Sequence, residues 1–173
     1  MPVVSLTRTR PFIGTLLVVS GALVAFGVVV QQQPGAVING NWWWFDIAAA
    51  VLGLALVAIA LSVAMTTVGV AAFWIGAAGW LVLAMGVVLR VPVLSSTGAV
   101  LALAGGLVGA VFAVQEHALP RIAGILFLVA MVLGALYLLD FIAALLPPVL
   151  QEVERLAFGA LLLLTGIFVL ARR

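Results

Sequence analysis

The chain contains no cysteine and no lysine, and only 7% of its 173 residues carry a charged side chain. Without cysteine there is no disulfide, no thiolate nucleophile and no cysteine-ligated zinc or iron–sulfur site. Without lysine there is no Schiff base for retinal. The single histidine, His117, cannot supply the paired ligands of a membrane haem or the histidines of a copper site. We therefore expect no cofactor and no metal site.

The low charge content also excludes a water-soluble domain. A soluble protein has roughly 25% charged residues with which to cover its surface, whereas this chain is 67% hydrophobic. We therefore expect the protein to lie in the lipid bilayer and to contact lipid over most of its surface. Seven arginines against five acids give a net charge of +2, which is too little for a nucleic-acid surface.

Long apolar runs predict an all-α integral membrane protein, a single transmembrane domain over residues 1–173. A helix needs about 20 apolar residues to cross a hydrocarbon core of roughly 30 Å. Six helices are predicted near residues 11–30, 45–65, 68–89, 94–114, 121–146 and 149–171. The uncharged stretch between Asp46 and Arg90 is too long for one helix, so we place a break at the adjacent hydroxyl residues Thr66 and Thr67.

Short polar residues at helix starts are candidate N-caps, because their oxygens accept bonds from free backbone amides. Asp46 is the predicted cap of the second helix, and Ser95, Ser96 or Thr97 that of the fourth. Both ends are predicted to be cytoplasmic in the cell (inner) membrane. That orientation places five arginines on the cytoplasmic side (Arg8, Arg10, Arg121, Arg172 and Arg173) and two outside (Arg90 and Arg155).

A weak internal period is present. Gly14, Gly69 and Gly124 are spaced 55 residues apart, which predicts three hairpins of about 55 residues inserted the same way round. The alternative is a chance alignment, because low-complexity bias makes such matches common. Residues 10–24 and 155–169 also share an arginine and two glycines, but the two predicted helices run in opposite directions, so we interpret this match as coincidence.

The hairpin unit combines a glycine-rich helix, a proline on the outer side and a second helix of small residues. Its best instance is Gly86-Val-Val-Leu-Arg90-Val-Pro92, which leads into the small-residue segment 98–109. This plan resembles the HdeD-like family of small six-helix membrane proteins, which are associated with acid resistance. The resemblance implies a small integral membrane protein, with no catalytic or ligand residue to carry over.

Small residues at helical spacing predict the faces on which the helices pack. Gly105 and Gly109 form a small-x3-small pair. Four further pairs are spaced seven residues apart: Gly14 and Gly21, Gly79 and Gly86, Gly98 and Gly105, and Gly159 and Gly166. These faces serve contacts within the chain, or contacts with a second copy or another membrane protein.

Asp140 is the acid predicted to lie deepest in a helix, one turn from Tyr137 and on the same side of the membrane as Arg90 and Arg155. Intramembrane acids are functional candidates. The alternatives are a transport or proton-binding site, for which Asp140, Tyr137 and Arg90 are the candidates, and an interfacial anchor paired with an arginine.

The remaining polar and aromatic residues have simpler interpretations. Trp42-Trp43-Trp44 fits an interfacial aromatic belt, and Trp74 and Trp80 are six residues apart, hence on different faces. Glu116, His117 and Arg121 fall in a cytoplasmic turn with no assigned role. The sixth helix is predicted to begin with three solvated charged side chains on the outer side: Glu152, Glu154 and Arg155.

The expected function is structural, stress-associated or complex-assembling, exerted through helix packing. The alternative is a channel or transporter for a small neutral or apolar solute, because the predicted walls contain few polar residues. We do not expect an enzyme, since no nucleophile, base and stabiliser cluster in the sequence.

Overall fold

The computed structural model describes residues 6–31, 43–62, 65–143 and 147–171. These residues form six α-helices and no strand: α1 (Leu6–Gln31), α2 (Trp43–Ser62), α3 (Thr67–Val88), α4 (Pro92–Gln115), α5 (Arg121–Ala143) and α6 (Pro148–Ala171). All six are long and apolar enough to cross a membrane. The predicted all-α, multi-pass membrane fold is therefore confirmed.

Both predicted N-caps, that of the second helix and that of the fourth, are wrong. Helix α4 begins at Pro92 after Val91, with no side-chain cap, because a proline at the first position has no amide to satisfy. Ser95, Ser96 and Thr97 consequently lie inside the helix. Helix α2 begins at Trp43 and Asp46 lies within its first turn, where the helix dipole still favours a negative charge.

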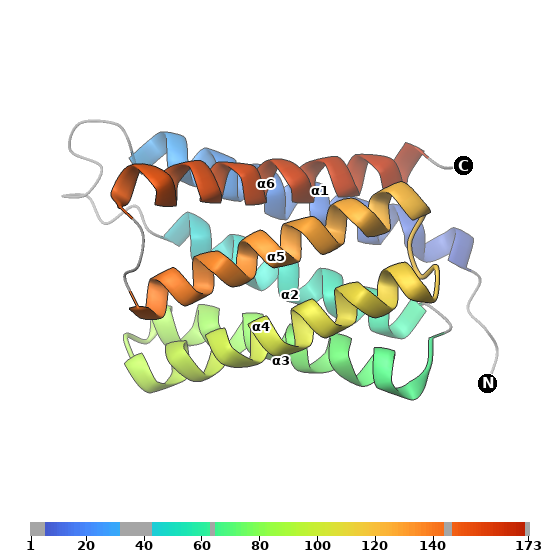
Figure 1. The fold of residues 1–173 in the computed structure, drawn as a ribbon, viewed down its shortest axis with the longest axis horizontal. Helices are drawn as coiled ribbons and strands as arrows, with labels where there is room; N and C mark the ends of the chain where they lie inside the picture. Colours follow the sequence, from blue (N-terminus) through green and yellow to red (C-terminus); the bar gives the residue numbers. More distant parts are fainter. Residues whose placement is uncertain (1–5, 32–42, 63–64, 144–146, 172–173) are drawn as a thin grey trace.

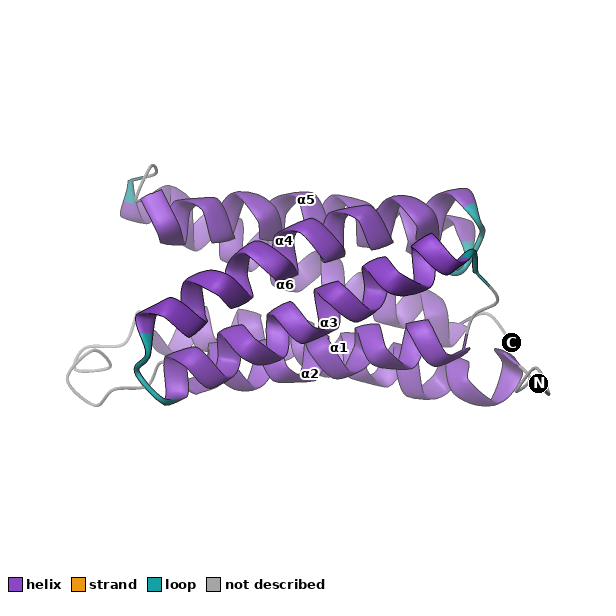
Figure 2. Cartoon of the chain, turned by 90° about the horizontal axis from the view of Figure 1, so that it is seen from below, coloured by secondary structure: helices purple, strands orange, loops and turns teal. Residues whose placement is uncertain are grey.

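The six helices form a closed, flattened ring. In the described residues each helix packs on its neighbours in the chain, and α6 returns to pack on α1. Figure 1 shows α1 and α6 together along one edge and α3 and α4 along the opposite edge, with α2 and α5 between them. Figure 2 shows α2 and α5 on opposite sides of the bundle. We call the end where α1 begins and α6 finishes the terminal end, and the opposite end the far end.

The α1–α6 edge is a glycine-to-glycine interface. A Cβ atom on Gly21 would run into the backbone of Gly159, and one on Gly166 would lie 2.6 Å from the carbonyl oxygen of Gly14. Only glycine allows backbones to approach this closely. The shared pattern of residues 10–24 and 155–169 therefore has a structural counterpart, since these two segments pack against each other.

The α3–α4 edge is built in the same way. A Cβ on Gly105 would meet the backbone of Gly76, and one on Gly79 the backbone of Ala102. Gly86 faces Ser95 and Gly98 faces Leu83, and a Cβ on Gly109 would lie 3.4 Å from the ring of Phe73. All the glycines that the sequence singled out for packing thus make contacts within the chain. The 55-residue hairpin repeat stays a prediction.

At the terminal end of the bundle, a side-chain contact joins the start of α3 to the end of α4. The carboxylate of Glu116 accepts hydrogen bonds from Thr66 N (2.8 Å) and Thr66 Oγ1 (2.6 Å). Thr66 is the N-cap of α3, and its hydroxyl oxygen accepts a bond from the Gly69 amide at 3.3 Å. The helix break predicted at this hydroxyl pair is confirmed, and Glu116 gains a role that the sequence did not indicate.

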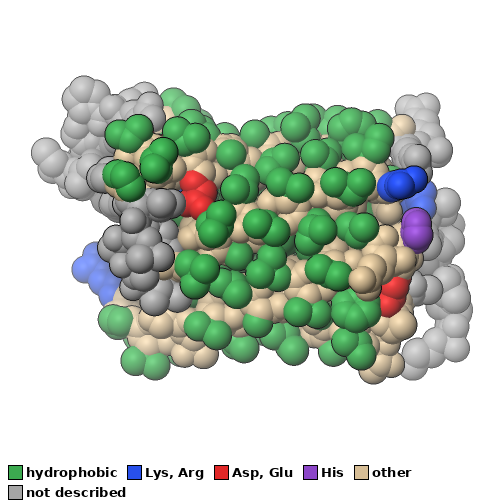
Figure 3. All heavy atoms as spheres, in the orientation of Figure 1, with side chains coloured by type: hydrophobic (Ala, Val, Ile, Leu, Met, Phe, Trp, Pro, Cys, Tyr) green, Lys and Arg blue, Asp and Glu red, His purple; other side chains and the backbone are tan. Residues whose placement is uncertain are grey.

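Hydrophobic side chains cover the middle of the face seen in Figure 3, and the charged ones lie toward its two ends. His117 is exposed in the turn before α5, with a positive φ of 54°. This distribution fits a bundle surrounded by lipid and bounded by water at both ends.

Candidate functional site

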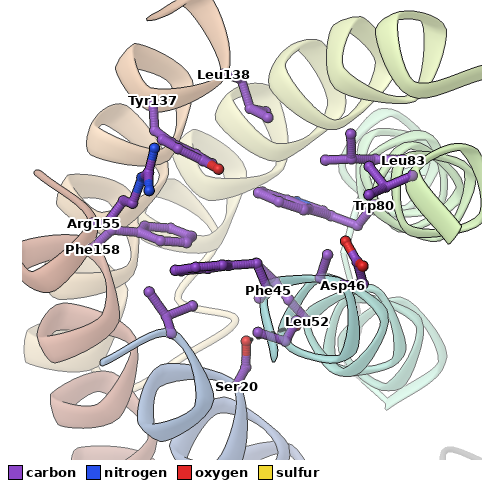
Figure 4. Close-up of a pocket in the computed structure, with 14 residues that line it drawn as sticks. Ser20, Phe45, Asp46, Leu52, Trp80, Leu83, Tyr137, Leu138, Arg155 and Phe158 are labelled. Atoms are coloured by element: carbon purple, nitrogen blue, oxygen red, sulfur yellow. Dashed lines mark hydrogen bonds between the residues drawn. The ribbon is translucent and has the colours of Figure 1, made fainter. Parts of the chain in front are cut away.

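A cavity of about 70 Å³ lies toward the far end of the ring, lined by α1, α2, α3, α5 and α6. The residues come together because each lies in the far-end half of its own helix. Phe45 and Asp46 begin α2, Trp80 lies about two turns before the end of α3, and Arg155 lies about two turns into α6. Figure 4 shows these side chains converging on one space.

Aromatic rings form much of the pocket wall. Trp80 and Phe158 stack with ring centroids 6.1 Å apart and planes inclined by 14°, and both line the pocket with Phe45 and Tyr137. Trp80 is only 4% exposed, whereas Trp74 is 44% exposed on the outer surface. The prediction that the two tryptophans occupy different faces of their helix is confirmed.

Arg155 lies against two of these rings. Its guanidinium carbon is 5.1 Å from the centroid of Tyr137 and 5.6 Å from that of Phe45, and its Nη2 donates to Gln151 Oε1 at 3.5 Å. A cation over an aromatic face is attracted by the ring quadrupole. The prediction that the charged side chains at the start of α6 are solvated is therefore wrong for two of them. Arg155 lines the pocket, and Glu154 is only 8% exposed. At this point α6 already packs against its neighbours.

Three further polar groups belong to the pocket. The hydroxyl of Ser20 donates to the Ala48 carbonyl oxygen at 3.0 Å, so it is satisfied. The Asp46 carboxylate lies on the same side of the pocket as Trp80, and Arg155 lies on the opposite side (Figure 4). The indole Nε1 of Trp80 is buried and has no hydrogen-bond acceptor among the residues that the structure describes.

A second aromatic pair closes the ring on the terminal side of the pocket. Phe73 of α3 and Phe127 of α5 stack with centroids 6.3 Å apart and planes inclined by 15°, and both are fully buried. Phe73 precedes Trp80 by seven residues, which is about two helical turns on the same face. Packed aromatic side chains therefore occupy the bundle between the pocket and the terminal end.

The structure separates the candidates that the sequence grouped. Tyr137 lines the pocket. Arg90 is instead exposed in the turn between α3 and α4, with a φ of 55°. Asp140 falls in α5, but its side chain is outside the described part of the chain, so its predicted pairing stays a prediction. Arg155 was expected as a solvated residue or a pairing partner of Asp140, and Asp46 as a cap.

Within the described ranges, no group of three histidine or acidic side chains could hold a metal ion. Neither a protein-family model, nor a curated protein, nor a solved structure matches the chain. The resemblance to the HdeD-like family stays a prediction. The function must therefore be argued from the pocket and the ring around it.

Proposed function

We propose that this membrane protein binds a small neutral solute in the far-end pocket and carries it across the membrane. The observation that supports this most is the position of the cavity. It lies among five helices of the ring, and the buried, stacked Phe73 and Phe127 pack between α3 and α5 nearer the terminal end. A pocket within the bundle, with packed side chains toward one end, is the arrangement expected of a carrier in one of its alternating states.

The pocket chemistry favours a neutral solute. Among the residues that the structure describes, Asp46 and Arg155 are the only charged side chains that line it, and they have opposite signs. An ion of either sign would face a like charge in a site whose other walls are mostly apolar, where desolvation is costly. The volume of about 70 Å³ is roughly half of the 150 Å³ that holds benzene in an engineered protein cavity. The enclosed solute therefore has about three or four non-hydrogen atoms.

A role exerted through helix packing with another chain has less support. That expectation depended on free faces of small residues, and the singled-out glycines pack inside this chain. Their interfaces close the ring and shape the pocket. We therefore rank solute binding above assembly with a homo-oligomer or a membrane partner.

We further propose that the chain lies in the inner membrane with both termini cytoplasmic. The support is the excess of arginines assigned to the terminal end, five against two. The pocket then lies toward the outer side, and the Phe73–Phe127 stack toward the cytoplasm.

A flux measurement tests the proposal. The purified protein is placed in liposomes, and acetamide uptake is followed by light scattering after rapid mixing. Ala49 lines the pocket, so Ala49→Leu should fill the cavity and reduce the protein-dependent rate to near the protein-free background. Ala78 is exposed on α3, and Ala78→Leu should retain the full rate. Equal flux in the two variants, or no protein-dependent flux in the unaltered protein, would count against the proposal.

A further inference from the structure

The indole N–H of Trp80, a pocket residue, is a hydrogen-bond donor without an acceptor among the described residues. Its Nε1 atom is buried, and leaving a buried donor unpaired is destabilising. The ring is held in place by its stack with Phe158. The Nε1 atom is covered by its neighbours, so a solute reaches it after those side chains shift slightly.

Asp46 supplies the complementary group. Its carboxylate lines the same pocket, on the side of Trp80. Among the described residues it takes part in no hydrogen bond or ion pair. An ionised carboxylate only accepts hydrogen bonds. One side of the pocket thus offers a donor and an acceptor next to apolar walls.

We infer that the pocket recognises a small neutral amide or alcohol. Its oxygen accepts from the Trp80 indole N–H, and its N–H or O–H donates to the Asp46 carboxylate. Its apolar part then lies along the aromatic and aliphatic wall. A cation meets Arg155 in the same pocket, and an anion meets Asp46, so both are disfavoured. This inference rests on the proposed function and names the solute class of that same pocket.

Three solutes of similar size and shape separate the hydrogen bond from Trp80 from the hydrogen bond to Asp46. Acetamide and 2-propanol carry both a donor and an acceptor, whereas acetone carries only an acceptor. Asp46→Asn should weaken acetamide and 2-propanol binding several-fold and leave acetone binding nearly unchanged. Trp80→Phe, which keeps an aromatic ring against Phe158, should weaken all three by about fivefold, as expected for a lost hydrogen bond of ordinary strength. Trp74→Phe, on the outer surface, is the matched control and should change none of them.

The direct readout is nuclear magnetic resonance of the indole N–H groups in protein reconstituted in nanodiscs. The chain has five tryptophans, and Trp80→Phe identifies the Trp80 signal by its loss. Acetamide should shift this signal saturably. If the methyl signals of Leu52 and Leu83 in the pocket move while the Trp80 signal does not, solute binding stands and the recognition by Trp80 is overturned. If neither set of signals moves with any of the solutes, both the inference and the proposed function fail.

Discussion

Trp80 and Phe158 stack across the centre of the ring, with centroids 6.1 Å apart, although the backbones of their helices, α3 and α6, do not contact each other. Phe73 and Phe127 connect α3 and α5 in the same way, closer to the terminal end. Helix contacts thus form the wall of the bundle, and aromatic side chains fill its middle. The pocket lies inside this wall, and its stacked pair Trp80 and Phe158 joins two helices whose backbones do not touch.

A single added methyl group in the α1–α6 interface should destabilise the protein. In Gly21→Ala the new Cβ would collide with the backbone of Gly159, and overpacking a contact of this kind costs about 3 kcal/mol. Gly124 is the control, because a Cβ there meets its nearest neighbour at an ordinary 3.6 Å. Gly124→Ala should be neutral or stabilise the helix by up to about 1 kcal/mol. Denaturation in mixed micelles measures both, and equal stability of the two variants would refute the close packing.

The contact between Glu116 and Thr66 should appear as a coupling energy. Hydrogen bonds to a charged group contribute about 1.5–3 kcal/mol when well formed. Glu116→Ala and Thr66→Val should each lower the unfolding free energy, and the double variant should lose less than the sum, with a coupling of about 1 kcal/mol. Strict additivity would show that the two side chains do not interact in solution.

Arg155 should not be replaceable by lysine. The guanidinium carbon lies over the rings of Tyr137 and Phe45, and the planar, weakly hydrated guanidinium suits aromatic faces better than a strongly hydrated ammonium does. Arg155→Lys should therefore lower stability by about 1 kcal/mol. Arg121 is exposed at the start of α5, so Arg121→Lys should cost nothing measurable. A similar loss in both variants would mean that the rings do not hold Arg155.

The orientation can be read by cysteine labelling, because the chain has no native cysteine. Val91→Cys lies in the far-end turn and Thr67→Cys at the terminal end. An impermeant thiol reagent added to intact cells should label Val91→Cys and leave Thr67→Cys unlabelled until the membrane is opened. The reverse pattern would invert the proposed orientation.

The helices were predictable because bilayer thickness sets their length, and breaks such as Thr66 and Pro92 interrupt the apolar runs. Glycine spacing likewise indicated the packing faces. It could not say that Gly14 and Gly21 meet α6, because spacing defines a face and not its partner.

The pocket was not predictable from the sequence. It depends on closure of the ring, which brings residues from five helices together. Arg155 follows two acids near the start of α6 and therefore resembles a solvated residue in the sequence. Only the approach of α2 and α5 shows that it lies against Phe45 and Tyr137.

Protection of a single thiol in the pocket tests solute binding most directly. Ala49→Cys places a thiol in the lining, and Ala78→Cys places one on the outer surface. A small thiol reagent should modify Ala49→Cys more slowly as acetamide is added, in a saturable manner, while Ala78→Cys reacts at an unchanged rate. If saturating acetamide leaves the Ala49→Cys rate unchanged, or slows both variants equally, the pocket does not bind this solute and the proposed function is contradicted.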